Sequence, residues 1–425
     1  MSDSSILDNV RGNLGVMMVS AGLWTFSGQL VWPFQSILVL RLGGSYFHIG
    51  LIASIGALAG ILPNLLGGYL ADTLGRRKMI ISMSYLVSLN TLIFYYARDW
   101  RWLIAGSIIN SIAIGLRQPA FSSIIADSTK EESRAQSYAL WAIVPPFFGV
   151  VSPYLMGVFM DRYGDLPMLR WGYLLLFFGS FIASSIRYFF LEDTITSVGL
   201  KENSPTILVS NIFNSLKEAI SILTKPLWIL GLMGLFFGFG AAIGSPYWIT
   251  YATQDVLGLS LSQWGLIAAA NNFTSLLVSL PLGRIADRKG RLKLLVPSIS
   301  ITPLAILAFT LSQGFVQAFV ISILITVLGS MGMTSGQALF TDLTKKEYRG
   351  RINALWNVAG TMQSFRIGVS PGSLLGATGN LLGGYLYENV GKAMPLYLQS
   401  GMIGLTAITG LKYLSEPKHP TMSGE

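Results

Sequence analysis

The chain has 425 residues, of which 52% are hydrophobic and only 12% are charged. A soluble protein carries about twice that fraction of charged residues, so the composition excludes an ordinary soluble domain and predicts a polytopic helical membrane protein. The net charge of +9 does not indicate nucleic-acid binding, because the basic residues lie in short loops between apolar runs.

Twelve apolar runs follow one another, each near the roughly 20 residues that a helix needs to cross a bilayer. Their approximate spans are 13–40, 48–70, 79–97, 102–126, 137–160, 170–191, 227–253, 262–286, 293–312, 315–341, 353–387 and 394–414. With an internal N-terminus, 21 of the 29 Lys and Arg, Arg187 among them, fall in cytoplasmic segments and six fall outside. This bias predicts a multi-pass protein of the cell membrane with both termini in the cytoplasm.

Two loops of similar sequence lie 215 residues apart. Residues 68–78 read GYLADTLGRRK, and residues 283–293 read GRIADRKGRLK. The same offset relates further pairs of segments, namely 50–53 with 265–268 and 127–134 with 342–349. Such matches in polar loops indicate two six-helix halves of common descent, arranged as parallel repeats.

These loops resemble the signature of the major facilitator superfamily, which joins helices 2 and 3 and again helices 8 and 9. The resemblance implies an all-α membrane protein with twelve transmembrane helices in two pseudo-symmetric six-helix bundles. It also implies a cytoplasmic gate, in which the signature Asp and Arg form a charge relay with the acidic end of helix 4. The corresponding residues are Asp72, Arg76, Asp127 and Arg134 in the first half and Asp287, Arg291, Asp342 and Arg349 in the second. Static anchoring of the loops by the same charges is the alternative.

The predicted domains are an N-terminal bundle at 1–191, a cytoplasmic linker at 192–225, and a C-terminal bundle with a short tail at 226–425. Apolar residues at helical spacing between 208 and 223 predict an amphipathic helix in the linker. The offset grows from 215 to 227 after Trp356, because residues 161–164 match 388–391. Helix 11 has therefore gained twelve residues and must protrude or break.

No Asp or Glu lies in the middle of an apolar run, so any proton coupling must use the gate acids or a helix-end group such as Asp161, Asp255 or Glu388. There is no cysteine, no catalytic cluster and no metal-ligand pattern, so we expect neither an enzyme nor a cofactor or metal. In helix 5, residues 149–157 read GVVSPYLMG. They weakly resemble a motif of the drug antiporters, and a small-residue helix contact is the alternative.

Polar residues within the apolar runs are candidates for lining a central cavity. They are Gln29, Trp32, Arg117, Asn271, Asn272, Gln337, Gln363 and Arg366. For Arg117, the alternative is a side chain that reaches toward the surface. For Arg366, which lies about 20 Å into helix 11 at helical rise, the alternative is a hydrogen bond to freed backbone carbonyls.

The sequence therefore predicts a secondary transporter that moves a small organic solute by alternating access, and its resemblance to the drug antiporters favours the efflux type. An organic-anion carrier or exchanger that uses the intramembrane arginines is the main alternative, and a non-transporting membrane sensor is a remote one. The expected partners are a small-molecule substrate and membrane lipids, with no nucleic acid, and we expect a monomer.

Overall fold

The computed structural model describes residues 12–129, 134–194, 217–218, 220–348, 352, 355–356 and 373–414. Every regular element within these residues is helical, and none of them forms a strand. The predicted amphipathic helix at 208–223 falls largely outside the described residues.

The chain divides into two compact units that do not follow the sequence halves throughout. Unit 1 comprises Met1–Ser45, Ala59–Asn203 and Ser260–Leu276, and unit 2 comprises Tyr46–Leu58, Ser204–Leu259 and Leu277–Glu425. Each unit thus contains one segment from the opposite half of the sequence. The two exchanged segments are related by the 215-residue offset, which takes residues 46–58 to 261–273. The predicted boundaries at 191 and 226 follow the sequence repeat. The units differ from them by these two segments and by dividing the predicted linker after Asn203.

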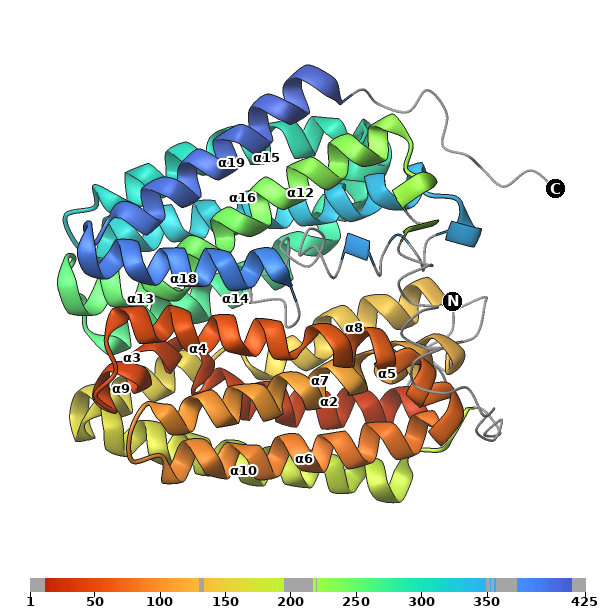
Figure 1. Ribbon diagram of the computed structural model, residues 1–425, viewed down its shortest axis with the longest axis horizontal. Coiled ribbons are helices and arrows are strands. Elements are labelled where there is room, and N and C mark those ends of the chain that lie inside the picture. The colour runs from red at the N-terminus through yellow and green to blue at the C-terminus, as the bar shows by residue number, and fades with distance from the viewer. Residues whose placement is uncertain are drawn as a thin grey trace. The chain divides into compact units, whose positions relative to one another are not determined.

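Unit 1 is built on α2, α6, α7 and α10, which lie side by side in Figure 1. Its elements are α2 (Asn13–Gln29), η1 (Trp32–Phe34), α3 (Gln35–Arg41), α5 (Ile61–Leu74), α6 (Arg76–Tyr96), α7 (Arg101–Asp127), α8 (Arg134–Phe148), α9 (Ser152–Tyr163), α10 (Asp165–Phe190) and the first part of α14 (Leu261–Lys289). The predicted fifth run is interrupted at 149–151, between α8 and α9.

Unit 2 is built on α12, α15, α16 and α19 (Figure 1). Its elements are α4 (Tyr46–Ala59), α12 (Lys225–Gly244), η3 (Ser245–Tyr247), α13 (Trp248–Thr250), η4 (Tyr251–Asp255), the second part of α14, α15 (Leu292–Thr310), α16 (Phe315–Leu343), η5 (Lys346–Tyr348), α18 (Leu374–Asn389) and α19 (Met394–Tyr413). The π-helical η4 ends the span that α12 begins.

Nine spans within the described residues are long and apolar enough to cross a membrane. Each of the twelve predicted runs overlaps a described helix. Within the predicted run 353–387, α18 begins at Leu374, and the Ser373 side chain accepts a hydrogen bond from the Gly376 N–H at 2.8 Å. Such a bond is typical of a helix N-cap, so the predicted run is not one uninterrupted helix.

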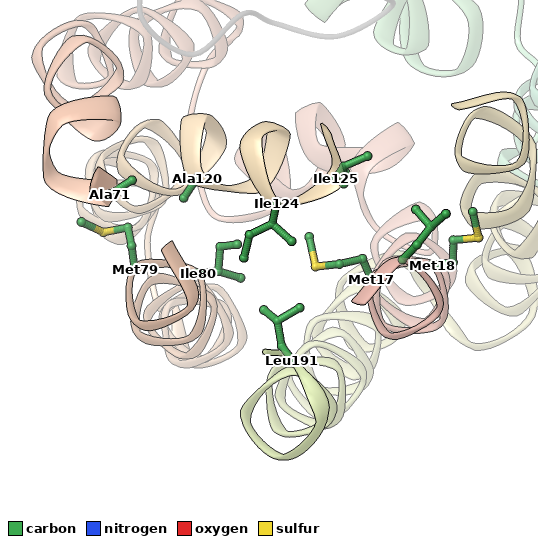
Figure 2. Close-up of a cluster of buried hydrophobic side chains, with 10 residues drawn as sticks. Met17, Met18, Ala71, Met79, Ile80, Ala120, Ile124, Ile125 and Leu191 are labelled. Atoms are coloured by element: carbon green, nitrogen blue, oxygen red, sulfur yellow. The ribbon is translucent and has the colours of Figure 1, made fainter. Parts of the chain in front are cut away.

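Each unit has an apolar core near the end where its signature loop lies. In unit 1, Met17, Ile80, Ile124 and Leu191 point toward one another from α2, α6, α7 and the end of α10 (Figure 2). The matching cluster of unit 2 includes Leu295, Leu339 and Trp356. These layers hold the helix ends that position the signature loops.

Candidate functional site

The two signature loops are tight turns at one end of each unit, which we name the basic end. In unit 1, Gly75 joins α5 to α6 with a φ of 95°. In unit 2, Gly290 joins α14 to α15 with a φ of 101°. Residues with a side chain rarely adopt such a positive φ, so glycine permits the same turn in both repeats.

Arg76 connects the loop of unit 1 to the end of α7. Its Nε lies 3.4 Å from Asp72 Oδ1, one turn earlier in the chain, and its Nη1 forms an ion pair with Asp127. The Arg76 side chain is 13% exposed, whereas that of Asp72 is 63% exposed. The Asp72 pair therefore lies in water, where such pairs contribute only about 0–1 kcal/mol. Three predicted residues thus meet at the basic end of unit 1.

Arg291 makes the equivalent contacts in unit 2. Its Nε lies 3.3 Å from Asp342 Oδ2, and its Nη1 forms an ion pair with Asp287. Burial lowers the pKa of Arg291, but hydrogen bonds to Asp287 and Asp342 outweigh this effect and raise the pKa above its ordinary value. The guanidinium group therefore remains charged and holds both carboxylates.

Each charge relay lies within a single unit. The ion pairs therefore stabilise the basic end of their own unit, and any gating effect must act through that end. Arg134 is exposed at the start of α8. Arg349 lies outside the described residues. Gating by these residues stays a prediction.

Two of the predicted cavity residues meet through a residue that the sequence did not single out. Trp32 packs edge to face on Trp24, with ring centroids 4.7 Å apart. The guanidinium carbon of Arg117 lies 5.6 Å from the centroid of the Trp24 ring. Arg117 is only 6% exposed, so its side chain stays in the core of unit 1 and does not reach the surface.

The other predicted cavity residues are dispersed. Gln29 on α2 and Asn271 and Asn272 on α14 are half-buried in unit 1, and Gln337 on α16 is exposed in unit 2. Gln363 and Arg366 lie outside the described residues. Contact with substrate stays a prediction for the whole set.

At the end of unit 1 opposite the basic end, which we name the far end, Asp161 caps the start of α14. Its Oδ1 accepts the Leu261 N–H at 3.0 Å, and its Oδ2 accepts the Ser262 N–H at 2.9 Å. The first N–H groups of a helix have no partner within the helix. A carboxylate accepts hydrogen bonds from them and places negative charge at the positive end of the helix dipole. We name this arrangement the first cap contact.

Unit 2 contains a second cap contact at its own far end. Glu388 Oε2 accepts the Phe47 N–H at 2.6 Å, at the start of α4. Glu388 matches Asp161 at the offset of 227, and Phe47 matches Ser262 at the offset of 215. The repeat thus places an acid on the first turn of the exchanged segment in both units.

Close backbone approach accompanies each cap contact. A Cβ atom added to Gly157 would collide with the backbone of Leu261 and Ser262, one added to Gly265 with that of Pro153, and one added to Gly50 with that of Asn380. One added to Gly384 would lie 2.9 Å from Tyr247 Oη and 3.0 Å from Phe47 Cα. The first two contacts map onto the last two by the repeat offsets. Glycine at these positions lets the helices pack closely, as small residues do in membrane helix interfaces.

The second cap contact adjoins a polar cluster around Asp255. Tyr46 Oη donates to Asp255 Oδ1 at 2.8 Å, and Tyr387 Oη donates to Oδ2 at 2.7 Å. Lys392 Nζ lies 3.7 Å from Oδ1 and 3.8 Å from the centroid of the Tyr46 ring. The Asp255 side chain is 15% exposed. This cluster joins the start of α4 to η4, to α18 and to the turn that follows α18.

Sequence reasoning named Asp161, Asp255 and Glu388 only as helix-end acids, and it missed Tyr46, Tyr387 and Lys392. The signal that could have revealed the cap contacts is the repeat itself, because both acids match one another and both capped helices match one another. Arg187 differs from its expected position in a cytoplasmic segment, because its side chain is 2% exposed and is buried in the last turn of α10.

The sequence matches the family model described as Major Facilitator Superfamily over residues 15–364 and 230–423. The multi-drug resistance efflux pump PmrA of Streptococcus pneumoniae is 27% identical over 298 residues, which cover 68% of this chain and 70% of that protein. The multidrug resistance protein MdtG of Salmonella typhimurium is 25% identical over 394 residues, which cover 89% and 91% of the two chains.

Solved structures share the fold at low sequence identity. The human organic anion transporter MFSD10 (TETRAN) has a TM-score of 0.66 at 16% identity, covering 93% of this chain and 98% of its own. The nucleoside transporter NupG has a TM-score of 0.68 at 14% identity, covering 95% and 100%. These likenesses confirm the predicted all-helical membrane fold. The chain therefore belongs to the major facilitator superfamily, whose members are multi-pass membrane transporters and not enzymes.

Proposed function

We propose that the chain exports a small organic solute across the cell membrane by alternating access, with both termini in the cytoplasm. Two named efflux pumps match most of its length, at 27% and 25% identity. The excess of basic residues in the loops of the basic ends supports a cytoplasmic position for those ends.

The reciprocal exchange of residues 46–58 and 260–276 is the observation that carries this proposal. Alternating access requires helical segments that are packed against neighbouring helices in one state and released from them in the other. Both exchanged segments begin at a capped helix start. The acid accepts two backbone N–H groups in unit 1 and one in unit 2, and closely packed glycines complete each small contact. Breaking such a contact involves few groups, so a transported solute can shift the balance.

A break in the predicted run 48–70 supports the release of its first part, α4. The chain turns at Gly60 between α4 and α5, and the boundary between units lies at the same place, after Leu58. Hinges are typically a few residues at the end of an element that absorb changes in φ and ψ. In this mechanism α4 moves on Gly60 while α5 stays with the signature loop.

An organic-anion carrier is the second candidate, because a buried arginine of unit 1 forms no ion pair within the described residues. Arg117 donates to Ser84 Oγ at 3.1 Å, which leaves its positive charge without a carboxylate partner in that part of the chain. An arginine presents a planar fork of donors that suits carboxylates and phosphates. Arg366, predicted from the sequence to contact such a group, would add a second fork.

Flux into reconstituted liposomes tests the proposal. Fluorescent amphipathic cations, neutral compounds and organic anions are offered separately, and flux is compared with liposomes that carry an Asp161→Ala and Glu388→Ala double variant. We expect movement of at least one class, and a change in its rate in the double variant. Binding without movement of any class identifies a sensor and contradicts the proposal. Transport of anions alone, lost in Arg366→Gln, selects the second candidate.

The direction of transport needs a separate measurement. Cells that express the chain are loaded with the transported compound, and its loss is followed after the external compound is removed. Export predicts a lower steady-state accumulation than in cells that lack the chain. A higher accumulation shows uptake and contradicts efflux, while the proposal of alternating access remains.

A further inference from the structure

Arg117 and Arg187 form a pair of buried cations in unit 1. Their exposed fractions are 6% and 2%. Both donate to the same atom, since Arg117 Nη1 lies 3.1 Å and Arg187 Nη1 lies 2.9 Å from Ser84 Oγ. Arg187 Nε also donates to Ser20 Oγ at 2.8 Å. Four helices, α2, α6, α7 and α10, therefore converge on two guanidinium groups.

The charge of this pair is not balanced within the described residues. There the two arginines form no ion pair, and their hydrogen bonds go to neutral serine hydroxyls. Arg117 Nε is buried without any hydrogen-bond partner. The ring of Phe121 lies 5.5 Å from the guanidinium carbon of Arg117 and 5.1 Å from that of Arg187. A cation–π contact attracts both cations to the ring but supplies no opposite charge.

An apolar layer separates the pair from the basic end. Met17, Ile80 and Ile124 lie three to seven positions along α2, α6 and α7 from Ser20, Ser84 and Arg117, toward the signature loop, and Leu191 follows Arg187 by four positions. The four side chains point toward one another (Figure 2). All four are at most 2% exposed. Long basic side chains in membrane helices normally extend toward water, and here this layer closes that route.

The second half of the sequence shows that the fold does not need these cations. The repeat offset of 215 takes Ser84 to Ile299 and Arg117 to Gly332, and the offset of 227 takes Arg187 to Leu414. Ile299 belongs to the apolar core of unit 2, and Leu414 is partly buried and packs against that core. The same helical framework is thus packed without charge in unit 2. Buried cations that the framework does not require normally face a functional partner.

We propose that Arg117, Arg187 and Ser84 form a binding site for a small monovalent anion of halide or carboxylate size. Such an anion cancels charge that the serines cannot cancel, and it accepts charge-assisted hydrogen bonds from both guanidinium groups. Close packing of the four helices limits the site to a small ligand. The inference does not depend on the proposed direction or substrate of transport, because binding is measured without flux.

The test uses the purified full-length chain in detergent. Sodium chloride or sodium acetate replaces sodium gluconate at constant ionic strength, and the melting temperature is followed. A ligand that binds only the folded state raises the melting temperature as its concentration passes the dissociation constant. We expect a saturable rise with chloride, with acetate or with both. Chloride alone identifies an inorganic anion as the ligand, and competition by acetate shows that the site also takes a carboxylate.

Matched variants separate this site from general salt effects. Arg117→Gln and Arg187→Gln should raise the half-saturating concentration at least tenfold. Arg170→Gln should leave it unchanged, because Arg170 donates to the Ala97 carbonyl at 3.1 Å outside this cluster. Ser84→Ala should lower the melting temperature in gluconate, and saturating chloride should restore it. Ser88→Ala should show no such rescue, because the buried Ser88 hydroxyl donates to the Ser84 carbonyl and does not contact the arginines.

Equal melting temperatures in chloride, acetate and gluconate overturn the proposal. So does an unchanged half-saturating concentration in both arginine variants. If neither arginine variant folds, crystals of the unaltered protein soaked in bromide decide the question. An anomalous peak within hydrogen-bond distance of both guanidinium groups supports the site, and its absence overturns it.

Discussion

The first cap contact allows a direct test of whether the exchanged segments are released during transport. The change is Asp161→Ala, which removes both acceptors from the start of α14 while leaving the apolar packing of α9 intact. Asp165→Ala is the matched control. Asp165 is an acid near the same turn, but its carboxylate pairs with Arg41 at 2.5 Å and not with α14.

The magnitude follows from the groups that lose their partners. Replacing an N-cap side chain by alanine costs about 0.5–2 kcal/mol, and a carboxylate near a helix N-terminus contributes about 0.3–1 kcal/mol through the dipole. The two effects overlap, and the contact with Ser262 lies at an exposed position. We therefore take about 1.4 kcal/mol, which corresponds to a tenfold change in an equilibrium constant.

The absence of cysteine from the chain makes the assay simple. The Leu261→Cys variant carries one cysteine, at a position that is only 8% exposed. This cysteine should react slowly with a maleimide while α14 stays capped. Adding Asp161→Ala should raise the labelling rate about tenfold, because the rate follows the released population. Adding Asp165→Ala should keep the rate within about twofold of the single-cysteine protein.

Two outcomes would refute the reasoning. An Asp161→Ala rate within twofold of the reference would show that α14 is held by packing alone. Equal increases in the Asp161→Ala and Asp165→Ala proteins would show general loosening of the far end. An exposed reference cysteine in Val256→Cys, at 48% exposure, controls for reagent access in every variant.

Three further predictions concern the signature-loop ion pair, the close backbone approach at Gly50 and the acids at helix ends. Asp72→Asn should leave the protein folded and shift its population toward the inward-open state by at most about 1 kcal/mol; unchanged label-to-label distances at the basic ends would count against this. Gly50→Ala should lower the melting temperature, because the new Cβ collides with the Asn380 carbonyl and overpacking costs about 1–3 kcal/mol; Gly329→Ala, with nothing within 4 Å, should not lower it. Transport should be uncoupled or driven by substrate exchange, with no stoichiometric proton uptake reported by a pH dye; proton uptake that survives neutralisation of the gate acids together with Asp161, Asp255 and Glu388 would show that an acid elsewhere couples transport to protons.

The repeat made much of this architecture predictable from sequence. Residues 68–78 and 283–293 share a spacing of Asp, Gly and Arg, and in the structure both loops place a positive-φ glycine before an arginine that holds two carboxylates. The turn and its ion pairs depend on local chemistry. The glycine and one carboxylate are close to the arginine in the sequence, and the second carboxylate lies at the end of an adjacent helix.

The buried arginine pair was not predictable in the same way. Arg187 comes three residues before the end of α10, where a basic residue is normally a sign of the cytoplasmic surface. Its burial depends on the direction of its side chain and on Ser20 and Ser84 from two other helices. Serines are common in membrane helices and carry no signal alone, so only tertiary packing reveals the cluster.

The insertion in the predicted run 353–387 leaves the two cap contacts equivalent, which supports a shared role for them. The twelve extra residues enter after Trp356, yet the spacing from glycine to acid is the same in Gly157 to Asp161 and in Gly384 to Glu388. The offset of 227 is already reached at Asn380, which faces Gly50 as Pro153 faces Gly265. The insertion therefore lies between Trp356 and Asn380, on the side of the basic end. It leaves the far-end contact in register, so the two cap contacts can still act as an equivalent pair.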